Sequence, residues 1–430
     1  MSIAKESNTS RDAVVPIMSL RQLSPWILAI LFLLLLPTVF ASGSALTIMN
    51  QMAITIIFAL AYNMLLGQGG MLSFGHAVYM GLGGFFCVHL LNMVENDGLW
   101  LPLPLLPLFG GIFGLIFAAI IGSFSTRRAG TVFAMISLGV GELIAASSII
   151  VVVFFGGEEG ISADRTMGPT VFGLDFASQL EVYYLTAIWL VLSAVGMYLF
   201  SKTPVGQIAN AVRDNEERAE FLGYSQRYVR FISFCASGFF CGIAGGLFAI
   251  NFEILTEENL NLATSGSILL ITFLGGVGFF IGPIIGAVVF TLLQTVLSLY
   301  TDIWQLYLGT LFLLTVMFFP FGLTGLIAIH IRPYKLGQIS ELYGPYLRMA
   351  GPAIVCVLSL AALLETAFHA KHSAVGEEHM SLFGIGYNSH AVLPWITIVG
   401  LIAVSGWFVR RLAPVVKEAW DNANHMEPKQ

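Results

Sequence analysis

The chain has 430 residues, of which 57% are hydrophobic and 10% charged, and its mean hydropathy is +0.84. This composition excludes an ordinary water-soluble domain and is typical of a polytopic membrane protein. The net charge of −6 is spread over loops, so no nucleic-acid-binding surface is expected. The four cysteines lie apart within apolar segments, which indicates small core residues and not a disulfide framework.

Twelve segments are apolar over about the 20 residues that a membrane-spanning helix needs. They lie near 25–43, 46–66, 76–93, 102–124, 130–155, 183–200, 231–250, 265–281, 283–300, 304–320, 350–368 and 391–409. Their many glycines favour closely packed helices over a β-barrel, whose strands alternate polar and apolar residues. We therefore predict an all-α polytopic membrane protein, a helical bundle of about ten core spans with two extra C-terminal spans. Because the first segment ends in small residues, a cleaved signal peptide is the alternative to a retained first span.

A glycine-rich stretch, GQGGMLSFGH at 67–76, is incompatible with a regular helix, since each glycine costs about 1 kcal/mol relative to alanine. Irregular backbone in a membrane survives only where protein or a water-filled cavity satisfies its polar groups. Gln68, Ser73 and His76 add donors and acceptors, so we predict a broken helix beside a translocation path. The alternative is close helix packing through small residues. For His76, a structural hydrogen bond is favoured over a proton relay.

Glu142 is the clearest ionisable residue within an apolar segment, and such residues mark transport paths. We treat it as a path candidate, with a hydrogen bond between helices as the alternative. A second glycine cluster around 275–283, followed by Pro283, predicts another break in the other half of the chain. Two interrupted segments suggest a pseudo-symmetric bundle with the path at the interface between its halves.

A polar loop at 201–230 lies between two apolar segments, and nine of its thirty residues are charged. Thr203 and Pro204 are typical of a helix start, and Asp214 with Glu217 three residues later fits a capping box. Gly223 is a typical C-terminal stop. The loop therefore predicts two short helices with small apolar faces among charges, as in a knob that docks into a groove of a soluble partner. A solvated amphipathic linker on the membrane surface is the alternative.

The distribution of basic residues predicts which face of the membrane each loop occupies. With twelve spans and both ends on one face, 17 of the 19 lysines and arginines lie on the face of the polar loop. Only Arg165 and Lys371 lie on the other. Because cytoplasmic loops carry the excess of lysine and arginine, the polar loop and both termini are predicted to be cytoplasmic.

The chain has no phosphate-binding loop, because none of its six lysines follows a glycine. It is therefore predicted to be no enzyme, to bind no cofactor itself, and to depend on another subunit for any ATP hydrolysis.

Four stretches in order resemble the permease subunits of branched-chain amino acid ABC transporters, LivM-type. They are NMLLGQGGMLSFGHAVYMGLGGF at 63–85, the polar loop with AVRDNEERAEFLG at its centre, GGVGFFIGPIIGAVVF at 275–290 and FFPFGLTGL at 318–326. The similarity covers residues 46–328, and the polar loop is its most specific part.

The resemblance implies that the polar loop inserts into a cleft of a cytoplasmic ATPase subunit. The residues that match the family's contact loop are Arg213, Asp214, Asn215, Glu216, Glu220 and Gly223. It further implies a heteromeric complex with a second homologous permease, two ATPase subunits that carry ATP and Mg²⁺, and a periplasmic or extracellular solute-binding protein. The implied location is the bacterial inner membrane, and the implied solutes are branched-chain or related small amino acids.

Three regions follow from these observations: a cytoplasmic segment at 1–24, the permease domain at 25–328, and a C-terminal extension at 329–430 with two spans. Members of this family usually end near 328, so the resemblance gives the extension no role. Its outer loop carries histidines and carboxylates that suggest zinc, but their spacing matches no closed site, which favours a fortuitous cluster. These residues are His369, His372, Glu377, Glu378, His379 and His390.

An ion-coupled secondary transporter of a small solute is the alternative function. Such proteins place ionisable residues in mid-membrane to bind the coupling ion. Here Glu142 is the clear case and Glu365 lies near a span end, so the sequence favours the ATPase-dependent permease.

Overall fold

The computed structural model describes residues 20–170, 173–319, 321–373 and 379–425. Within them the chain is almost entirely helical, and the strands form two short antiparallel pairs, β1 with β2 and β3 with β4. The elements are α1 (Leu20–Val39), α2 (Gly43–Asn63), η1 (Met64–Gln68), α3 (Ala77–Asp97), η2 (Leu103–Leu105), α4 (Leu106–Ser125), α5 (Gly130–Ile150), α6 (Val152–Phe155), β1 (Ile161–Ser162), η3 (Arg165–Met167), α7 (Gln179–Lys202), α8 (Pro204–Asp214), α9 (Glu216–Phe221), α10 (Gln226–Phe252), β2 (Ile254–Leu255), η4 (Glu257–Asn259), α11 (Leu262–Gly275), α12 (Gly282–Thr295), η5 (Leu297–Leu299), α13 (Trp304–Phe318), α14 (Gly322–Lys335), α15 (Ile339–His372), β3 (His379–Leu382), β4 (Ile385–Asn388) and α16 (Val392–His425).

The centre of the bundle is α10, which packs against α2, α3 and α4. Its contacts with α3 and α4 run through glycines, and a Cβ placed on Gly83 would lie 2.7 Å from the Cα of Gly242. Small residues let helix backbones approach closely in a membrane, where packing and not exclusion of water drives association. The predicted all-α polytopic bundle is confirmed.

Nine helices in the described part of the chain are long and apolar enough to cross a membrane, and α13 with α14 is a tenth candidate, bent by 45°. Twelve spans were predicted. Two of the predicted segments, those that form α1 and α11, are not among these ten candidates. At about 1.5 Å per residue, the 14 residues of α11 extend about 21 Å, less than the hydrocarbon core. It ends at Gly275, and α12 then runs back beside it as an antiparallel partner.

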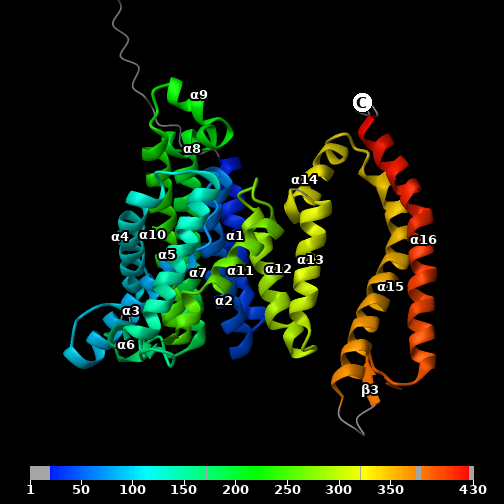
Figure 1. Ribbon diagram of the computed structural model, residues 1–430, viewed down its shortest axis with the longest axis horizontal. Coiled ribbons are helices and arrows are strands. Elements are labelled where there is room, and N and C mark those ends of the chain that lie inside the picture. The colour runs from blue at the N-terminus through cyan, green and yellow to red at the C-terminus, as the bar shows by residue number, and fades with distance from the viewer. Residues whose placement is uncertain (1–19, 171–172, 320, 374–378, 426–430) are drawn as a thin grey trace, which may run out of the picture.

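The C-terminal extension forms a long helical hairpin, α15 and α16, closed by β3 and β4. Figure 1 shows it to one side of the bundle, beyond α13 and α14. The hydroxyl of Tyr307 on α13 donates to Glu365 on α15 at 2.9 Å, which joins the hairpin to the core near β3. Both predicted extra spans are present as helices.

The helices have two distinct ends. Figure 1 shows α8, α9 and the C-terminal end of α16 at one end, and α6 and β3 at the opposite end. The polar loop and the described C-terminus therefore lie on the same side of the bundle, as the charge distribution requires.

Candidate coupling and gating site

The polar loop folds as two short helices, α8 and α9. Thr203 caps α8, and its hydroxyl accepts a hydrogen bond from the Gly206 amide at 3.2 Å, as predicted. The prediction that Asp214 caps the second helix is wrong, because Asn215 caps α9 and accepts from the Arg218 amide at 2.9 Å. Asn215 alone has extended backbone between the helices, whereas Asp214 is still helical.

Gly223 ends α9 as predicted. Its φ of +87° lies in the left-handed region, which disfavours any residue with a Cβ. The amide of Gly223 donates to the Glu220 carbonyl at 2.9 Å, and the amide of Tyr224 donates to the Ala219 carbonyl at 3.2 Å. These bonds satisfy the last carbonyls of the helix and turn the chain toward α10.

The apolar residues of the polar loop divide into two groups. Ala209 and Val212 are buried together with Ala219 and Val229, and they hold α8 and α9 onto α10. The exposed group is a pair at the tip, Phe221, which is 91% exposed, and Leu222, which is 70% exposed. We call Phe221 and Leu222 the apolar tip. This pair is exposed and is free to act as the predicted knob.

The charged residues of the polar loop also divide. Glu216 forms an ion pair with Arg230 of α10, whose side chain is only 6% exposed. Glu220 accepts a hydrogen bond at 3.1 Å from Gln226, at the start of α10. These two predicted contact residues therefore brace the loop against the bundle, whereas the Asp214 side chain is 67% exposed.

The first predicted break is present, and we call residues 64–76 the first break. The helix loosens to a π-helix at η1, passes through Gly70 with φ of +64°, and resumes as α3 at Ala77. A π-helical turn inside a helix is rare and is frequent at functional sites.

His76 is a structural residue of this break. Its Nε2 hydrogen-bonds the Ser237 hydroxyl at 2.9 Å, and that hydroxyl donates to the Ala61 carbonyl at 2.6 Å. The fully buried ring stacks on Phe58 and meets the edge of Tyr62. These contacts tie the break to α2 and α10, which favours the structural interpretation of His76.

Ser73 and Gln68 lie in the same break, but neither contacts His76 through a hydrogen bond that the structure records. Within the described residues, the buried Ser73 Oγ and Gln68 Oε1 have no hydrogen-bond partner. Buried polar atoms without partners are rare in native proteins and mark places where water or another group is expected. Both atoms therefore remain candidates for lining a path.

The fourth path candidate, Glu142, lies on the exposed face of α5. Its neighbour Gly141 packs against Gly75, and the Ser137 hydroxyl accepts from the Phe74 amide at 3.1 Å. One side of α5 thus supports the first break, while Glu142 points away from this chain's own core. In the described residues no hydrogen bond joins Glu142 to Gln68, Ser73 or His76, although α5 packs against the break that holds them.

The second predicted break, residues 276–281 between α11 and α12, lies directly against the first. A Cβ on Gly67 would lie 2.6 Å from the Val277 carbonyl oxygen, and the Asn63 amide donates to the Phe279 carbonyl at 3.4 Å. Irregular segments from distant parts of the chain thus form one contact. Both breaks are encoded locally in the sequence, but their contact is not, because a local pattern carries no information on tertiary neighbours.

A third irregular segment joins this contact, at the start of α14. Gly276 packs against the Phe321 carbonyl and Gly322, and the Thr324 hydroxyl donates to the Gly275 carbonyl at 2.7 Å. The start of α14, within the stretch that resembles the family's closing segment, therefore packs on the second break.

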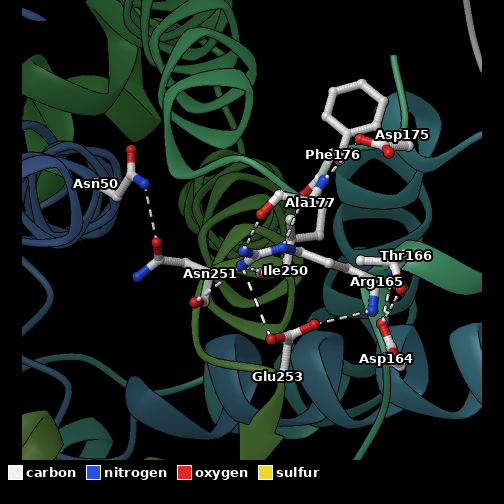
Figure 2. A network of polar contacts seen from close by, with 10 residues as sticks. All are labelled: Asn50, Asp164, Arg165, Thr166, Asp175, Phe176, Ala177, Ile250, Asn251 and Glu253. Carbon is white, nitrogen blue, oxygen red and sulfur yellow. Dashed lines mark hydrogen bonds and ion pairs between the residues drawn. The ribbon is translucent and has the colours of Figure 1, made fainter. Parts of the chain in front are cut away.

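At the opposite end of the bundle, Arg165 clamps residues 176–177 to the end of α10 (Figure 2). Its guanidinium donates to the carbonyls of Phe176 at 2.9 Å, Ile250 at 3.1 Å, Asn251 at 3.5 Å and Ala177 at 3.4 Å. Glu253 accepts from the Arg165 amide at 3.0 Å and lies 3.9 Å from the guanidinium. The carbonyls in the last turn of a helix lack partners within it, so the buried cation caps α10.

Asp164 precedes this clamp on the outside of the loop. Hydrogen bonds from the hydroxyl and amide of Thr166, at 2.6 and 2.7 Å, hold the pKa of its carboxyl below the usual range. Because these bonds favour the charged form, Asp164 supports the turn at neutral pH and loses that role only in acid.

Two histidines of the suggested cluster are engaged in hydrogen bonds. His369 bonds the Ser389 hydroxyl at 3.0 Å, and His372 bonds the Phe368 carbonyl at 3.0 Å. Glu377 and Glu378 lie outside the described residues. Among the residues described, no group of three or more histidine, cysteine, aspartate or glutamate side chains is arranged to hold a metal ion.

Comparison with known proteins identifies the family. Residues 44–320 match the family described as the permease component of branched-chain amino acid transport systems. The chain belongs to this family. It is a multi-pass membrane permease component of an ABC transporter.

The names of individual relatives refer to different solutes. It is 27% identical to the high-affinity branched-chain amino acid permease protein LivM of Escherichia coli K12 over 293 residues, 63% of this chain and 67% of the relative. It is 26% identical to the guanosine ABC transporter permease protein NupQ of Bacillus subtilis, over 60% of this chain and 84% of the relative. An autoinducer 2 import permease, LsrC of Klebsiella pneumoniae, is 31% identical over 35% of this chain and 46% of the relative. No solved structure matches the chain significantly.

Proposed function

We propose that this permease is the membrane subunit of an ABC importer for branched-chain or related small amino acids. It pairs with a second, homologous permease, two cytoplasmic ATPase subunits that bind ATP and Mg²⁺, and an external solute-binding protein. It lies in the bacterial inner membrane with the polar loop and both termini in the cytoplasm. The LivM relatives support an amino acid substrate. The matches to guanosine and autoinducer 2 permeases indicate that related permeases carry other small solutes.

The observation that carries the proposal is the polar loop. It is a folded unit of two capped helices, braced on α10 by a buried apolar cluster and by the Glu216–Arg230 ion pair. It presents the apolar tip, Phe221 and Leu222, away from the bundle. Large exposed apolar side chains beyond the membrane-spanning helices indicate a protein contact, and a groove in an ATPase subunit fits a helical knob of this size.

Glu142 supports the pairing with a second permease. A carboxylate in mid-membrane is costly against lipid and almost always faces other protein or a water-filled cavity. Since Glu142 lies near the middle of α5 and is exposed on this chain, its environment comes from another subunit or from the path between them. The same residue would serve the alternative, an ion-coupled transporter, as the site of the coupling ion.

The test is Phe221→Asp in the whole complex, co-expressed with the ATPase and binding-protein partners. A charge at the apolar tip is expected to remove the ATPase subunits from the purified complex and abolish uptake, while the permease still inserts. Phe383→Asp, at the tip of the β3–β4 turn on the opposite end, is the matched control and is expected to retain both. Normal ATPase binding by Phe221→Asp, or uptake by the permease alone under an ion gradient, would contradict the proposal.

A further inference from the structure

Arg213 contacts the first break from the polar loop with a side chain that is 38% exposed. It lies in the last turn of α8, and its Nη1 donates to the carbonyl oxygen of Gly67 in η1. Its other edge holds Asp214, with Nε at 3.0 Å and Nη2 at 2.8 Å from the same carboxylate oxygen. The guanidinium thus bridges the exposed end of α8 and the backbone of the first break.

The aliphatic part of the same side chain covers Gly70. A Cβ on Gly70 would lie 2.7 Å from Cγ and 3.3 Å from Cβ of Arg213. Gly70 also has φ of +64°, so both its backbone and its packing require glycine. The first break and the polar loop are therefore fitted to each other at this one arginine.

We infer that Arg213 is a positioning residue that links the polar loop to the first break, so that displacement of α8 moves η1. The inference rests on the proposed ATP-driven import, and it assigns Arg213 an inward role instead of a contact with the ATPase. From η1 the connection continues through Gly67 to Val277, and through Gly276 to Gly322. Arg213 thereby contacts the first break directly, the first break contacts the second, and the second contacts the start of α14.

The chemistry of this link explains why arginine stands at the position. A guanidinium holds a carbonyl on one edge and a carboxylate on the other in fixed planar geometry, whereas an ammonium is a point charge on a flexible stem. Bonds to a charged donor are shorter and stronger than neutral ones, which suits a contact that must transmit force.

The experiment compares solute uptake per ATP hydrolysed in the complete complex reconstituted in vesicles. Arg213→Gln is expected to keep the ATPase subunits and hydrolysis within about twofold of wild type, while uptake per ATP falls at least tenfold. Arg213→Lys is expected to restore part of that ratio. Arg128→Gln removes the same charge from the exposed α4–α5 turn and is expected to leave the ratio unchanged.

Gly70→Ala is the second variant, because it displaces the Arg213 side chain without removing its charge. It is expected to show the same loss of uptake per ATP, and it decides the question if Arg213→Gln does not reach the membrane. An unchanged ratio in the recovered variants, or loss of the ATPase subunits from the Arg213→Gln complex, would overturn the link. Absence of ATP-driven uptake in the wild-type complex would instead refute the proposed function, and the link with it.

Discussion

We expect Glu216→Gln to loosen the polar loop from the bundle without unfolding the bundle. The substitution removes the carboxylate that pairs with Arg230, whose side chain is 6% exposed, while that of Glu216 is 47% exposed. Removing one partner of a fully buried pair costs about 3–5 kcal/mol, and an exposed pair contributes about 0–1 kcal/mol. Because one partner is buried and the other is half-exposed, we expect the substitution to weaken docking of the polar loop onto the bundle by about 2 kcal/mol. That free energy corresponds to a ~30-fold larger population of the undocked loop.

Hydrogen exchange of the purified full chain measures this population, because amides in a locally opening segment exchange in proportion to the open fraction. Amides of α8 and α9 are expected to exchange about 30-fold faster in Glu216→Gln, with α2, α3 and α4 unchanged. Glu217→Gln, one residue along on the exposed side of α9, is the matched control. The reasoning fails if Glu216→Gln exchanges like wild type, or if Glu217→Gln gives the same acceleration.

Two further predictions concern the outer clamp and the exposed face of α5. Arg165→Met is expected to destabilise the chain by on the order of 3 kcal/mol, since four backbone carbonyls lose a charged donor, and a lower midpoint of thermal unfolding in detergent would measure it. A midpoint equal to that of wild type would show that solvent replaces the arginine. Glu142→Gln is expected to reduce uptake by the complex at least tenfold while leaving the midpoint for this chain unchanged, because its side chain is exposed here. Unimpaired uptake would remove Glu142 from the path.

Local sequence patterns were sufficient to predict most of the helices and the breaks between them. Glycine and proline act on the backbone at their own positions, so the first break, the second break and the stop at Gly223 were predictable. Cap choice was less certain, because Asp214 and Asn215 are equally good capping residues and only the backbone between α8 and α9 selects one. Hydropathy located the apolar segments but not the point at which a helix such as α11 ends and the chain turns back.

Tertiary contacts of the candidate site lay beyond sequence reasoning. Arg213 and Gly67 are 146 residues apart, and Asn63 and Phe279 are 216 apart. Nothing in either local pattern specifies the other partner. For the same reason the inward role of Glu216 was not visible, because a charged residue in a polar loop has the same pattern whether it meets solvent, a partner or a buried arginine.

The clamp at Arg165 changes what a protein approaching that end of the bundle would meet. The charge distribution predicts that Arg165 lies on the face of the membrane with few basic residues. Its guanidinium donates to backbone carbonyls and pairs with Glu253. The segment around Arg165 is therefore ordered before any partner binds. It is attached to α10, the helix that contacts the polar loop at its other end. A protein that binds at this end would pay little conformational entropy to order the segment around Arg165. A force that it exerts there would act on α10 directly and not through a flexible loop.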